Sequence, residues 1–343
     1  MLQTLQSYDW PLSHVYISAD TGVAALLSQL DNEIAFWRSQ LYADSTKAAY
    51  KSHIRMYTKF CDLIQIAPVP ATTTTICRYA AFLARTKCLS TIKQYLNVIR
   101  IINAEFSLPN PLGGWELKTV LGGIKRHKGE ARNQKSPLLP EHLSLLFKSL
   151  DLDNLEHLQL WCISLTAFFG LLRVSNVTSK SQTSPGLCIL RNDIIFKTQG
   201  CVLLVRKSKT NQYQAKPHEV VLPYVPNSIL CPVTALARYL SRTQAIPATS
   251  PISMGLNGSR HIALTQGNFR KRLTSALKDI GLPSELYNTH SLRRGGATWL
   301  LSTGVPLAMV KSIGDWTSDA VFAYFKPNTD LKFNSVKSAC LNL

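Results

Sequence analysis

The chain has 343 residues, with 38 Lys or Arg against 20 Asp or Glu and a formal net charge of +18, and its length suffices for two domains with separate cores. A basic excess of this size indicates an anionic partner such as nucleic acid; the plainer alternative is a soluble basic protein without one. Eight scattered cysteines lack zinc-ligand spacing, so we expect buried, reduced thiols. No run reaches eighteen apolar residues and the first residues lack a secretory signal pattern, so we expect a soluble intracellular protein with no membrane span.

Residues 1 to about 28 show no clear periodicity, so we expect a flexible lead-in there. From residue 30 to Ile124 the spacing of apolar residues favours helices throughout. Within this stretch four helices have clear bounds, at about residues 45–66, 74–85, 91–105 and 115–124. Each carries apolar residues along one face, as Tyr57 and Phe60 do in the first, and a small bundle follows from packing those faces together.

Basic residues recur every four positions on the first of these helices, namely Lys47, Lys51, Arg55 and Lys59. Residues at this spacing share one helix face, so they form a stripe able to follow the phosphates of a duplex. Lys93, on the surface of the third helix, adds to the basic outer side. The alternative interpretation is a solvated lysine face with no partner.

The stretch from Lys125 to Pro137 is polar and basic and ends in proline, which favours a linker. It opens with Lys125, Arg126 and Lys128, which we expect to contact DNA; nuclear import is an alternative role for the same basic patch. The resulting division is a lead-in at 1–28, a helical DNA-binding domain at 29–128, a linker at 129–138 and a second domain at 139–343.

The second domain should be α+β. Helices are expected at about residues 140–149, 155–172, 232–242 and 266–280, and short strands at 193–196, 201–205 and 219–223. The helix at 155–172 is almost wholly apolar and is therefore expected in the core, with Arg173 emerging at its carboxyl end. Lys207 and Lys209 follow the second strand on a hairpin able to reach into a site.

Near the carboxyl end, His290, Arg293 and Arg294 fall on one helical turn of a helix predicted from about His290 to Thr303. Thr289 is the expected N-cap. A helix amino terminus that carries a histidine and an arginine fork suits an anion, most plausibly a phosphate. An isolated His-x-x-Arg pair usually has a structural role. The choice between a structural and a catalytic role therefore depends on the other motifs that accompany it and on their order in the sequence.

Those neighbours are Arg173 in Gly170-Leu-Leu-Arg-Val-Ser-Asn, Lys209 in Ser-Lys-Thr, Trp316 in Gly-Asp-Trp, and Tyr324 on a last short helix. In this order, with His290 and Arg293, they resemble the tyrosine recombinases of the phage integrase superfamily. The details are most similar to the recombinases of eukaryotic Crypton, Ngaro and DIRS-type transposable elements. The resemblance spans residues 30 to 325 and departs from the family at Asn176, which stands where an acidic residue is common.

The resemblance implies a reaction and a role for each residue. The Tyr324 hydroxyl attacks a DNA phosphodiester, forms a 3′-phosphotyrosyl link and frees a 5′-hydroxyl. Arg173 and Arg293 neutralise charge on the non-bridging oxygens, because guanidinium is planar and always charged. His290 and the Trp316 indole add donors, and His290 also helps deprotonate the tyrosine.

A lysine protonates the departing 5′-oxygen, since an ammonium releases a proton where a guanidinium does not. Lys209 is the expected donor, and Lys207 is the rival two residues away. The reaction needs no metal and no cofactor, because the covalent link keeps the bond energy.

The implied fold is mainly α with a small β-sheet: a four-helix core-binding (SAM-like) domain and an α+β catalytic domain, which together form a C-shaped clamp around double-stranded DNA. Family members assemble as a homodimer on each site and a homotetramer in the synapse. A eukaryotic element further implies a nuclear location and a role in mobilising or integrating DNA.

Three other functions stay open at this point. The first is a catalytically silent DNA-binding protein derived from such a recombinase. The second is relaxation of supercoils by the same chemistry. A metal-dependent nuclease is the third, but it needs clustered carboxylates, and the motifs have none near them.

Overall fold

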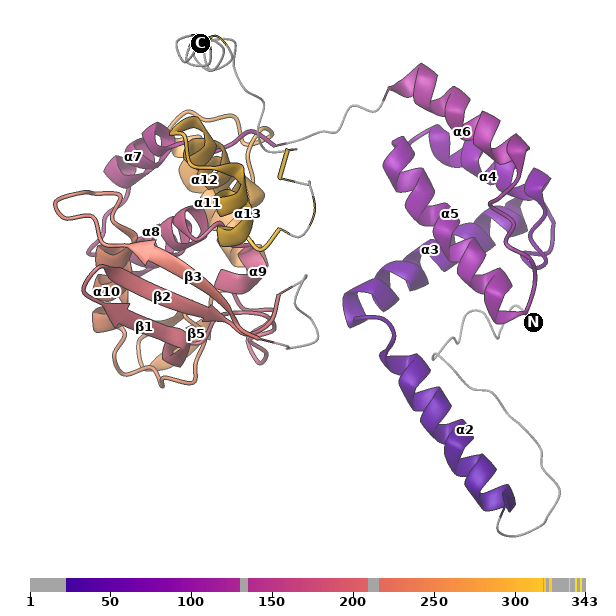
Figure 1. Cartoon of the computed structure of the whole chain (residues 1–343), viewed down its shortest axis with the longest axis horizontal. Helices are drawn as coiled ribbons and strands as arrows, with labels where there is room; N and C mark the ends of the chain where they lie inside the picture. The colour runs from indigo at the N-terminus through magenta and orange to yellow at the C-terminus, as the bar shows by residue number, and fades with distance from the viewer. Residues whose placement is uncertain are drawn as a thin grey trace. The chain divides into compact units, whose positions relative to one another are not determined.

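The computed structural model (Figure 1) describes residues 23–129, 135–208 and 216–316, together with positions 318, 321, 322, 333, 337 and 340. The chain divides into two compact units, Met1–Asn133 and Gln134–Leu343. The division falls inside the segment predicted to be a linker.

Five helices of unit 1 are described: α2 (Val23–Gln40), α3 (Asp44–Leu63), α4 (Thr73–Ala84), α5 (Leu89–Glu105) and α6 (Trp115–Lys128). Helices α3 to α6 surround one core and confirm the predicted bundle. Its centre contains the predicted apolar residues of α3 together with Tyr79, Ile92 and Ile99, all fully buried.

Helix α2 corrects the predicted lead-in, because it begins at Val23, whereas the lead-in was expected to continue to residue 28. Its first turns are rich in Ala and Leu, which are strong helix formers even without burial. No residue of α2 is buried. Residues 1–22 of the predicted lead-in lie outside the described part of the chain.

Helix α6 also differs from expectation, since it continues to Lys128. It therefore includes the basic run from Lys125 to Lys128, where the linker was predicted to begin. Cationic side chains in a last turn interact favourably with the helix dipole, which explains why they extend the helix. Gly129, with φ 71°, then ends it in a conformation that favours glycine.

Unit 2 is α+β, as predicted. Its described helices are α7 (Pro140–Ser149), α8 (Leu155–Phe169), α9 (Val174–Val177), α10 (Pro232–Arg242), α11 (Gln266–Asp279), α12 (His290–Ser302) and α13 (Leu307–Ile313), with a 3-10 turn, η1 (Arg191–Asp193). The core forms around α8, in which every residue from Leu158 to Phe168 is buried.

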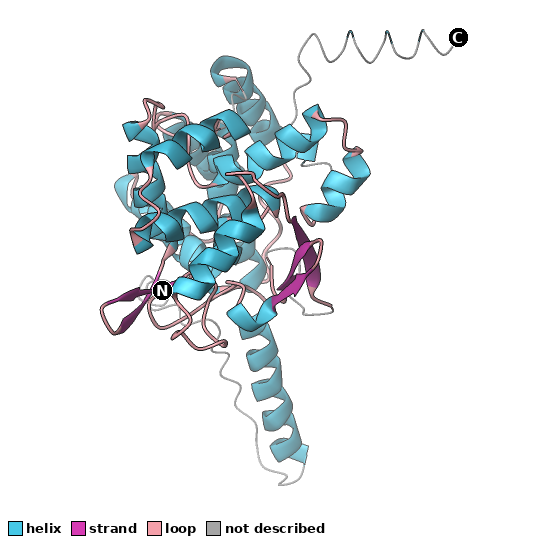
Figure 2. Cartoon of the chain, turned by 90° about the vertical axis from the view of Figure 1, so that its left-hand side faces the viewer, coloured by secondary structure: helices cyan, strands magenta, loops and turns pink. Residues whose placement is uncertain are grey.

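Strands β1 (Ile194–Lys197), β2 (Gly200–Val205) and β3 (His218–Pro223) form an antiparallel sheet with β2 in the centre, which confirms the three predicted strands. A second hairpin, β4 (Met254–Asn257) with β5 (Arg260–Ala263), was not predicted. Figure 2 shows these two small sheets in magenta among the helices. Asn257-Gly258 is a hairpin-turn signal that sequence analysis overlooked.

Two glycines let α12 approach neighbouring backbone, Gly295 at Leu138 before α7 and Gly296 at Phe168 in the last turn of α8. A Cβ on Gly295 would lie 1.6 Å from the Leu138 carbonyl oxygen, and one on Gly296 would lie 2.1 Å from the Phe168 oxygen. Only glycine fits at such contacts. This packing brings the amino end of α12, with its histidine and arginines, next to the chain that leaves α8 at Arg173.

The cysteines are all free thiols, and five of them are buried as expected. Cys88 and Cys340 are exposed, which differs from the expectation of buried thiols. Among the described residues, no helix is both long and apolar enough to cross a bilayer.

Candidate active site

Helix α12 begins at His290 but is not capped as predicted. Thr289 has helical φ and ψ, and its side chain accepts no capping hydrogen bond. Instead, the side-chain oxygen of Asn288 accepts from the His290 backbone N–H at 2.8 Å, and the Ser291 hydroxyl accepts from the Asn288 N–H at 3.0 Å. Asparagine is as good a cap as threonine, so the correction moves the cap by one residue.

Positive charge surrounds the His290 imidazole. Burial of part of the ring, followed by the charges of Arg293, Arg173 and Arg294, lowers the pKa of His290 to about 4. The residue still reaches solvent. Its imidazole is therefore neutral at pH 7, with a nitrogen lone pair able to accept a proton. The same shift shows that the arginines of α12 and Arg173 lie within electrostatic reach of one ring.

Arg293 is buried, with 2% of its surface exposed. Its guanidinium donates hydrogen bonds to the carbonyl oxygens of Leu171, at the end of α8, and of Gly314, at 2.7 Å for the latter. Its central carbon lies 4.0 Å from the centroid of the Trp316 ring, a close cation–π contact. The arginine that was predicted to bind phosphate thus also joins α8, α12 and the Trp316 turn.

Trp316 is held under that guanidinium by a turn that requires glycine. A Cβ on Gly314 would lie 1.7 Å from the indole ring. Asp315 follows with φ 53°, and the Trp316 backbone N–H donates to the Lys311 carbonyl at 3.0 Å. The tryptophan is 9% exposed, so its ring is mostly packing surface.

Arg173 is the half-buried residue between α8 and α9. Its guanidinium makes no hydrogen bond or ion pair with another described residue of the chain. A cation in this position retains its donors for a ligand, and a bidentate anion such as a phosphate matches its geometry.

Asn176 contacts Arg173 through the backbone alone: its N–H donates to the Arg173 carbonyl at 2.8 Å, and its side chain is directed to other partners. It is buried, and its amide donates to the carbonyl oxygens of Leu187 at 3.4 Å and Lys207 at 3.3 Å. An uncharged amide can satisfy two carbonyls, which a carboxylate cannot, so the substitution suits this contact. Lys207 itself is exposed beyond the end of β2.

The structure therefore brings together four of the six predicted catalytic residues, Arg173, His290, Arg293 and Trp316. The other two, Lys209 and Tyr324, lie outside the described residues. Among the described residues, no group of His, Cys, Asp and Glu could hold a metal ion.

The predicted DNA-binding residues of unit 1 lie on its surface. Lys51, Arg55 and Lys59 are exposed on α3, and Lys47 is half-exposed. Exposed positions on α5 and α6 carry the remainder, namely Lys93, Lys125, Arg126 and Lys128. The Lys128 ammonium donates to the backbone carbonyls of Ala84 and Lys87, so it also fastens α6 to the end of α4.

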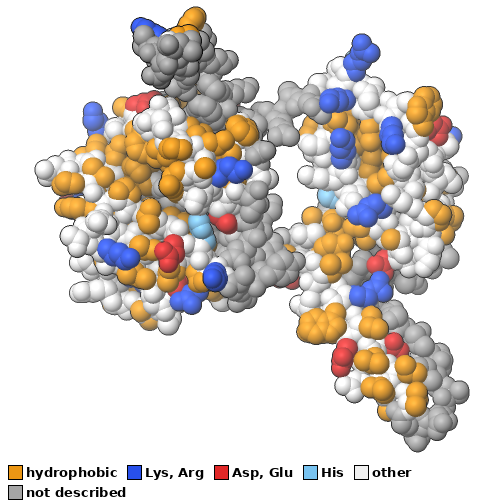
Figure 3. All heavy atoms as spheres, in the orientation of Figure 1, with side chains coloured by type: hydrophobic (Ala, Val, Ile, Leu, Met, Phe, Trp, Pro, Cys, Tyr) orange, Lys and Arg blue, Asp and Glu red, His pale blue; other side chains and the backbone are white. Residues whose placement is uncertain are grey.

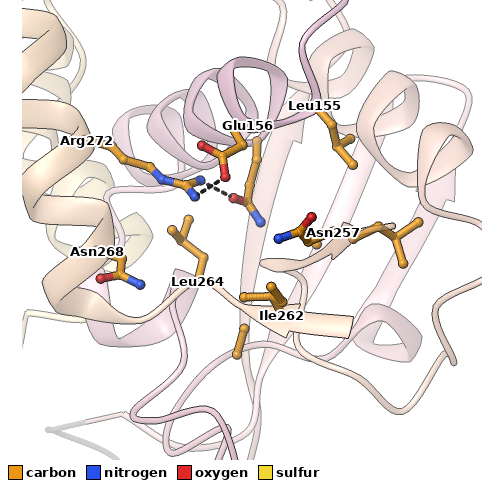
Figure 4. A pocket seen from close by; sticks show the side chains of 11 residues that line it. Leu155, Glu156, Asn257, Ile262, Leu264, Asn268 and Arg272 are labelled. Atoms are coloured by element: carbon orange, nitrogen blue, oxygen red, sulfur yellow. Dashed lines mark hydrogen bonds and ion pairs between the residues drawn. The ribbon is translucent and has the colours of Figure 1, made fainter. Parts of the chain in front are cut away.

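A separate pocket lies between the start of α8, the β4–β5 hairpin and α11 (Figure 4). Arg272 crosses it and donates to Glu156 at 2.7 Å and Gln159 at 2.8 Å. These contacts occupy the arginine within the fold. The pocket contains none of the predicted catalytic residues.

No family model matches the chain. Over 261 residues it is 28% identical to the integrase/recombinase xerD homolog of Selenomonas ruminantium, covering 75% of this chain and 73% of that protein. This relative is bacterial and lends no support to a nuclear location.

Three solved structures share the fold. XerH recombinase bound to palindromic difH substrate has a TM-score of 0.64 at 15% identity, covering 98% of this chain and 93% of that one. The Tn1549 transposon integrase with right-end DNA scores 0.62 at 14% identity, covering 92% and 98%. A lambda integrase tetramer on a Holliday junction scores 0.59 at 15% identity, covering 90% and 82%.

We predict that His290 titrates near pH 4, which NMR of the labelled imidazoles would measure. Because its folded pKa lies below the unfolded value of about 6.5, the unfolded chain binds more protons between those values. The contribution of His290 to stability is present above pH 6.5 and is lost as pH falls toward 4.

Arg173→Ala should raise the pKa of His290, since it removes one of the charges that depress it. Arg270→Ala is the matched control, because Arg270 is exposed on α11 and is not among those charges. A wild-type value near 6.5, or equal values in the two variants, would contradict the described cluster.

Proposed function

We propose that this chain, a member of the tyrosine recombinase/integrase family, cleaves and rejoins DNA strands at specific sites through a covalent bond between Tyr324 and a 3′-phosphate. The observation that carries the proposal is the convergence of Arg173, His290, Arg293 and Trp316 from separate segments of unit 2. Three guanidinium groups, those of Arg173, Arg293 and the neighbouring Arg294, and a neutral imidazole at one place suit a phosphodiester that gathers charge as it reacts.

In this mechanism the Tyr324 oxygen forms a bond to phosphorus as the bond to the 5′-oxygen breaks. The phenol has an ordinary pKa of about 10, so it needs a base to give up its proton at neutral pH. His290 is the proposed base, since burial and the nearby arginines keep its imidazole neutral at pH 7. Arg173 retains its donors for the non-bridging oxygens, while Arg293 contributes its charge from a buried position.

A lysine then protonates the departing 5′-oxygen. Lys209 remains the proposed donor and Lys207 its rival. The phosphotyrosyl bond stores the energy of the original ester, so a 5′-hydroxyl from another strand reverses the step and releases Tyr324. Joining therefore needs no nucleotide cofactor and no metal.

Double-stranded DNA is the proposed partner of both units. The basic stripe on α3, the basic end of α6 and the cations of unit 2 supply the phosphate contacts. The sequence motifs further support an origin in a Crypton, Ngaro or DIRS-type element, with excision or integration of that element as the reaction. We propose a nuclear location only on the condition that the chain has this eukaryotic origin.

Protomers of this chain are proposed to associate on DNA as a homodimer at each site and a homotetramer in the synapse. Helix α2 supports this, because large apolar residues recur at alternating spacings of four and three from its first residue to just past its end. This seam consists of Val23, Leu27, Leu30, Ile34, Trp37 and Leu41. Their exposed fractions range from 43% to 66%, and orange side chains cover much of α2 in Figure 3.

Such a spacing is that of a helix that packs lengthwise on another helix. The charged residues of α2 are Asp31, Glu33 and Arg38, so it carries one negative charge in a strongly basic chain. It therefore suits a protein partner better than a phosphate backbone, and the proposed partner is a second copy of this chain.

Tyr324→Phe should abolish covalent attachment to DNA and leave binding within about twofold. The substrate is a pool of nicked duplexes with a randomised core, in which the short cleaved fragment leaves and the adduct is trapped. Adducts would be recovered by their resistance to SDS and their sensitivity to protease. Tyr224→Phe, at an exposed tyrosine of unit 2, is the control and should behave as wild type.

Addition of EDTA should leave adduct formation unchanged. Trapping by Tyr324→Phe would show that another residue is the nucleophile. DNA binding without any adduct from the wild-type protein would favour the catalytically silent alternative.

Alanine at Lys51, Arg55 and Lys59 together should weaken DNA binding and flatten its salt dependence. Each lost phosphate contact on B-DNA lowers the slope of log K against log salt by about 0.9, so the triple variant should lose roughly two to three. Lys148→Ala, at an exposed lysine of α7 outside the proposed interface, should change neither quantity. Equal slopes in the triple variant and wild type would remove the α3 stripe from the interface.

Leu30→Glu should prevent pairing of protomers on DNA, because it places a charge in the middle of the apolar seam. Mass photometry on a duplex that holds two copies would show a shift from paired to single occupancy. Asn32→Glu adds the same charge at an exposed position of α2 outside the seam and should leave pairing intact. Pairing by both variants would exclude the seam as the protomer contact.

A further inference from the structure

The chain entering the β2–β3 hairpin is fixed at its last described residue by a contact with a distant turn. Ser208 is 3% exposed, and its hydroxyl donates to a carboxylate oxygen of Asp315 at 3.0 Å. Asp315 stands between Gly314, whose carbonyl accepts from Arg293, and Trp316, which stacks under the same guanidinium. This hydrogen bond, here called the latch, therefore joins the hairpin to the turn that completes the arginine cluster.

The two residues before Ser208 are also held, each by a different element. The Arg206 guanidinium donates to the buried Asp193 carboxylate at 2.6 Å, and the Lys207 carbonyl accepts from the Asn176 amide at 3.3 Å. Three consecutive residues are thus anchored to η1, to α9 and to the turn after α13. Both candidate proton donors, Lys207 and Lys209, are the immediate sequence neighbours of Ser208.

The returning strand contacts the same region. The His218 ring nitrogen Nε2 lies 3.1 Å from the Ile313 carbonyl oxygen, at the start of β3 and the end of α13. The hairpin is therefore joined to the α13 turn from both of its strands. Of these contacts only the latch uses a side chain of the turn itself.

We propose that Ser208 and Asp315 are positioning residues for protonation of the leaving 5′-oxygen, and that the latch fixes where the hairpin lysine begins relative to Trp316 and Arg293. The proposal rests on the proposed function. A lysine ammonium sits on a flexible four-carbon stem, so its reach is defined only if its backbone is held. General-acid catalysis further requires the donor within hydrogen-bond distance of the leaving oxygen.

Asp315 suits this role for a second reason. Its φ of 53° lies in the left-handed region, where Gly, Asn and Asp are tolerated and most residues are strained. Asp315→Gly therefore removes the carboxylate without straining the turn. Asp315→Asn keeps both the backbone tolerance and an oxygen acceptor for Ser208.

The test compares two versions of the duplex recovered by covalent capture. One carries the ordinary phosphodiester at the scissile position, and the other has sulfur in place of the bridging 5′-oxygen. A thiolate leaves without receiving a proton, so cleavage of the sulfur substrate does not depend on the general acid. The rate of adduct formation is measured in single turnover, and DNA binding is measured in parallel.

Ser208→Ala and Asp315→Gly should each slow cleavage of the ordinary substrate by about tenfold or more, within the range of general-acid effects. On the sulfur substrate both should remain within about threefold of wild type. Asp315→Asn should be close to wild type on both. The double variant Ser208→Ala with Asp315→Gly should be no slower than either single variant, because both remove one contact.

Equal slowing on the two substrates, or no slowing on either, would overturn the role of the latch in protonation. Ser208→Ala tests the contact from the hairpin side, so the outcome does not depend on the folding of a single variant. Absence of an adduct from the wild-type protein on both substrates would instead overturn the proposed function, and with it the latch. If the wild-type protein forms an adduct but each variant is affected equally on the two substrates, only the proposed role of the latch is overturned.

Discussion

A guanidinium that leaves water must recover both its hydrogen bonds and its charge stabilisation, and Arg293 recovers them from two segments of the chain. Its donors bind the carbonyl of Leu171, just after α8, and the carbonyl of Gly314, and its face covers Trp316. Loss of any partner would leave a buried charge unsatisfied, which is strongly unfavourable. One side chain therefore links the end of α8, α12 and the Trp316 turn.

That placement carries an electrostatic cost in the absence of DNA. Arg173, Arg293 and Arg294 all act on His290, and the imidazole stays neutral, so it adds no further positive charge to theirs. An incoming phosphate supplies the missing negative charge, so its binding relieves repulsion that the folded protein already contains. The same field that prepares the site for an anion also keeps His290 in the form that accepts a proton. Phosphate affinity and the neutral state of His290 thus both follow from one charge arrangement.

Much of the fold could be predicted from the sequence, because the apolar spacing of α3, α5 and α8 leaves little choice of buried face. The failures have local causes. The β4–β5 hairpin has short strands of mixed composition, and only Asn257-Gly258 signalled it. Helix α2 was placed too late because its first turn was assigned to the lead-in, although its apolar spacing of four and three already begins at Val23.

The site was predicted as an ordered set of residues, but the contacts that assemble it were not. The hydrogen bond between Ser208 and Asp315 joins residues that lie 107 positions apart in the sequence. No local sequence pattern predicts such a pair. The same holds for the amide of Asn176 on Lys207. Family resemblance indicated the residues that are proposed to act on a substrate. The residues that hold those side chains in place are evident only from the folded structure.

The two arginines of the candidate site therefore differ in what they can reveal. Substitution of Arg293 would remove a phosphate-directed charge and at the same time release α8 and the Trp316 turn, so a loss of activity would not separate chemistry from folding. Arg173 has no such structural contacts among the described residues, and its charge reaches the reaction through the ligand and through His290. Substitution of the half-buried Arg173 is for this reason the better test of phosphate binding. Substitution of the buried Arg293 is the better test of how the site is assembled.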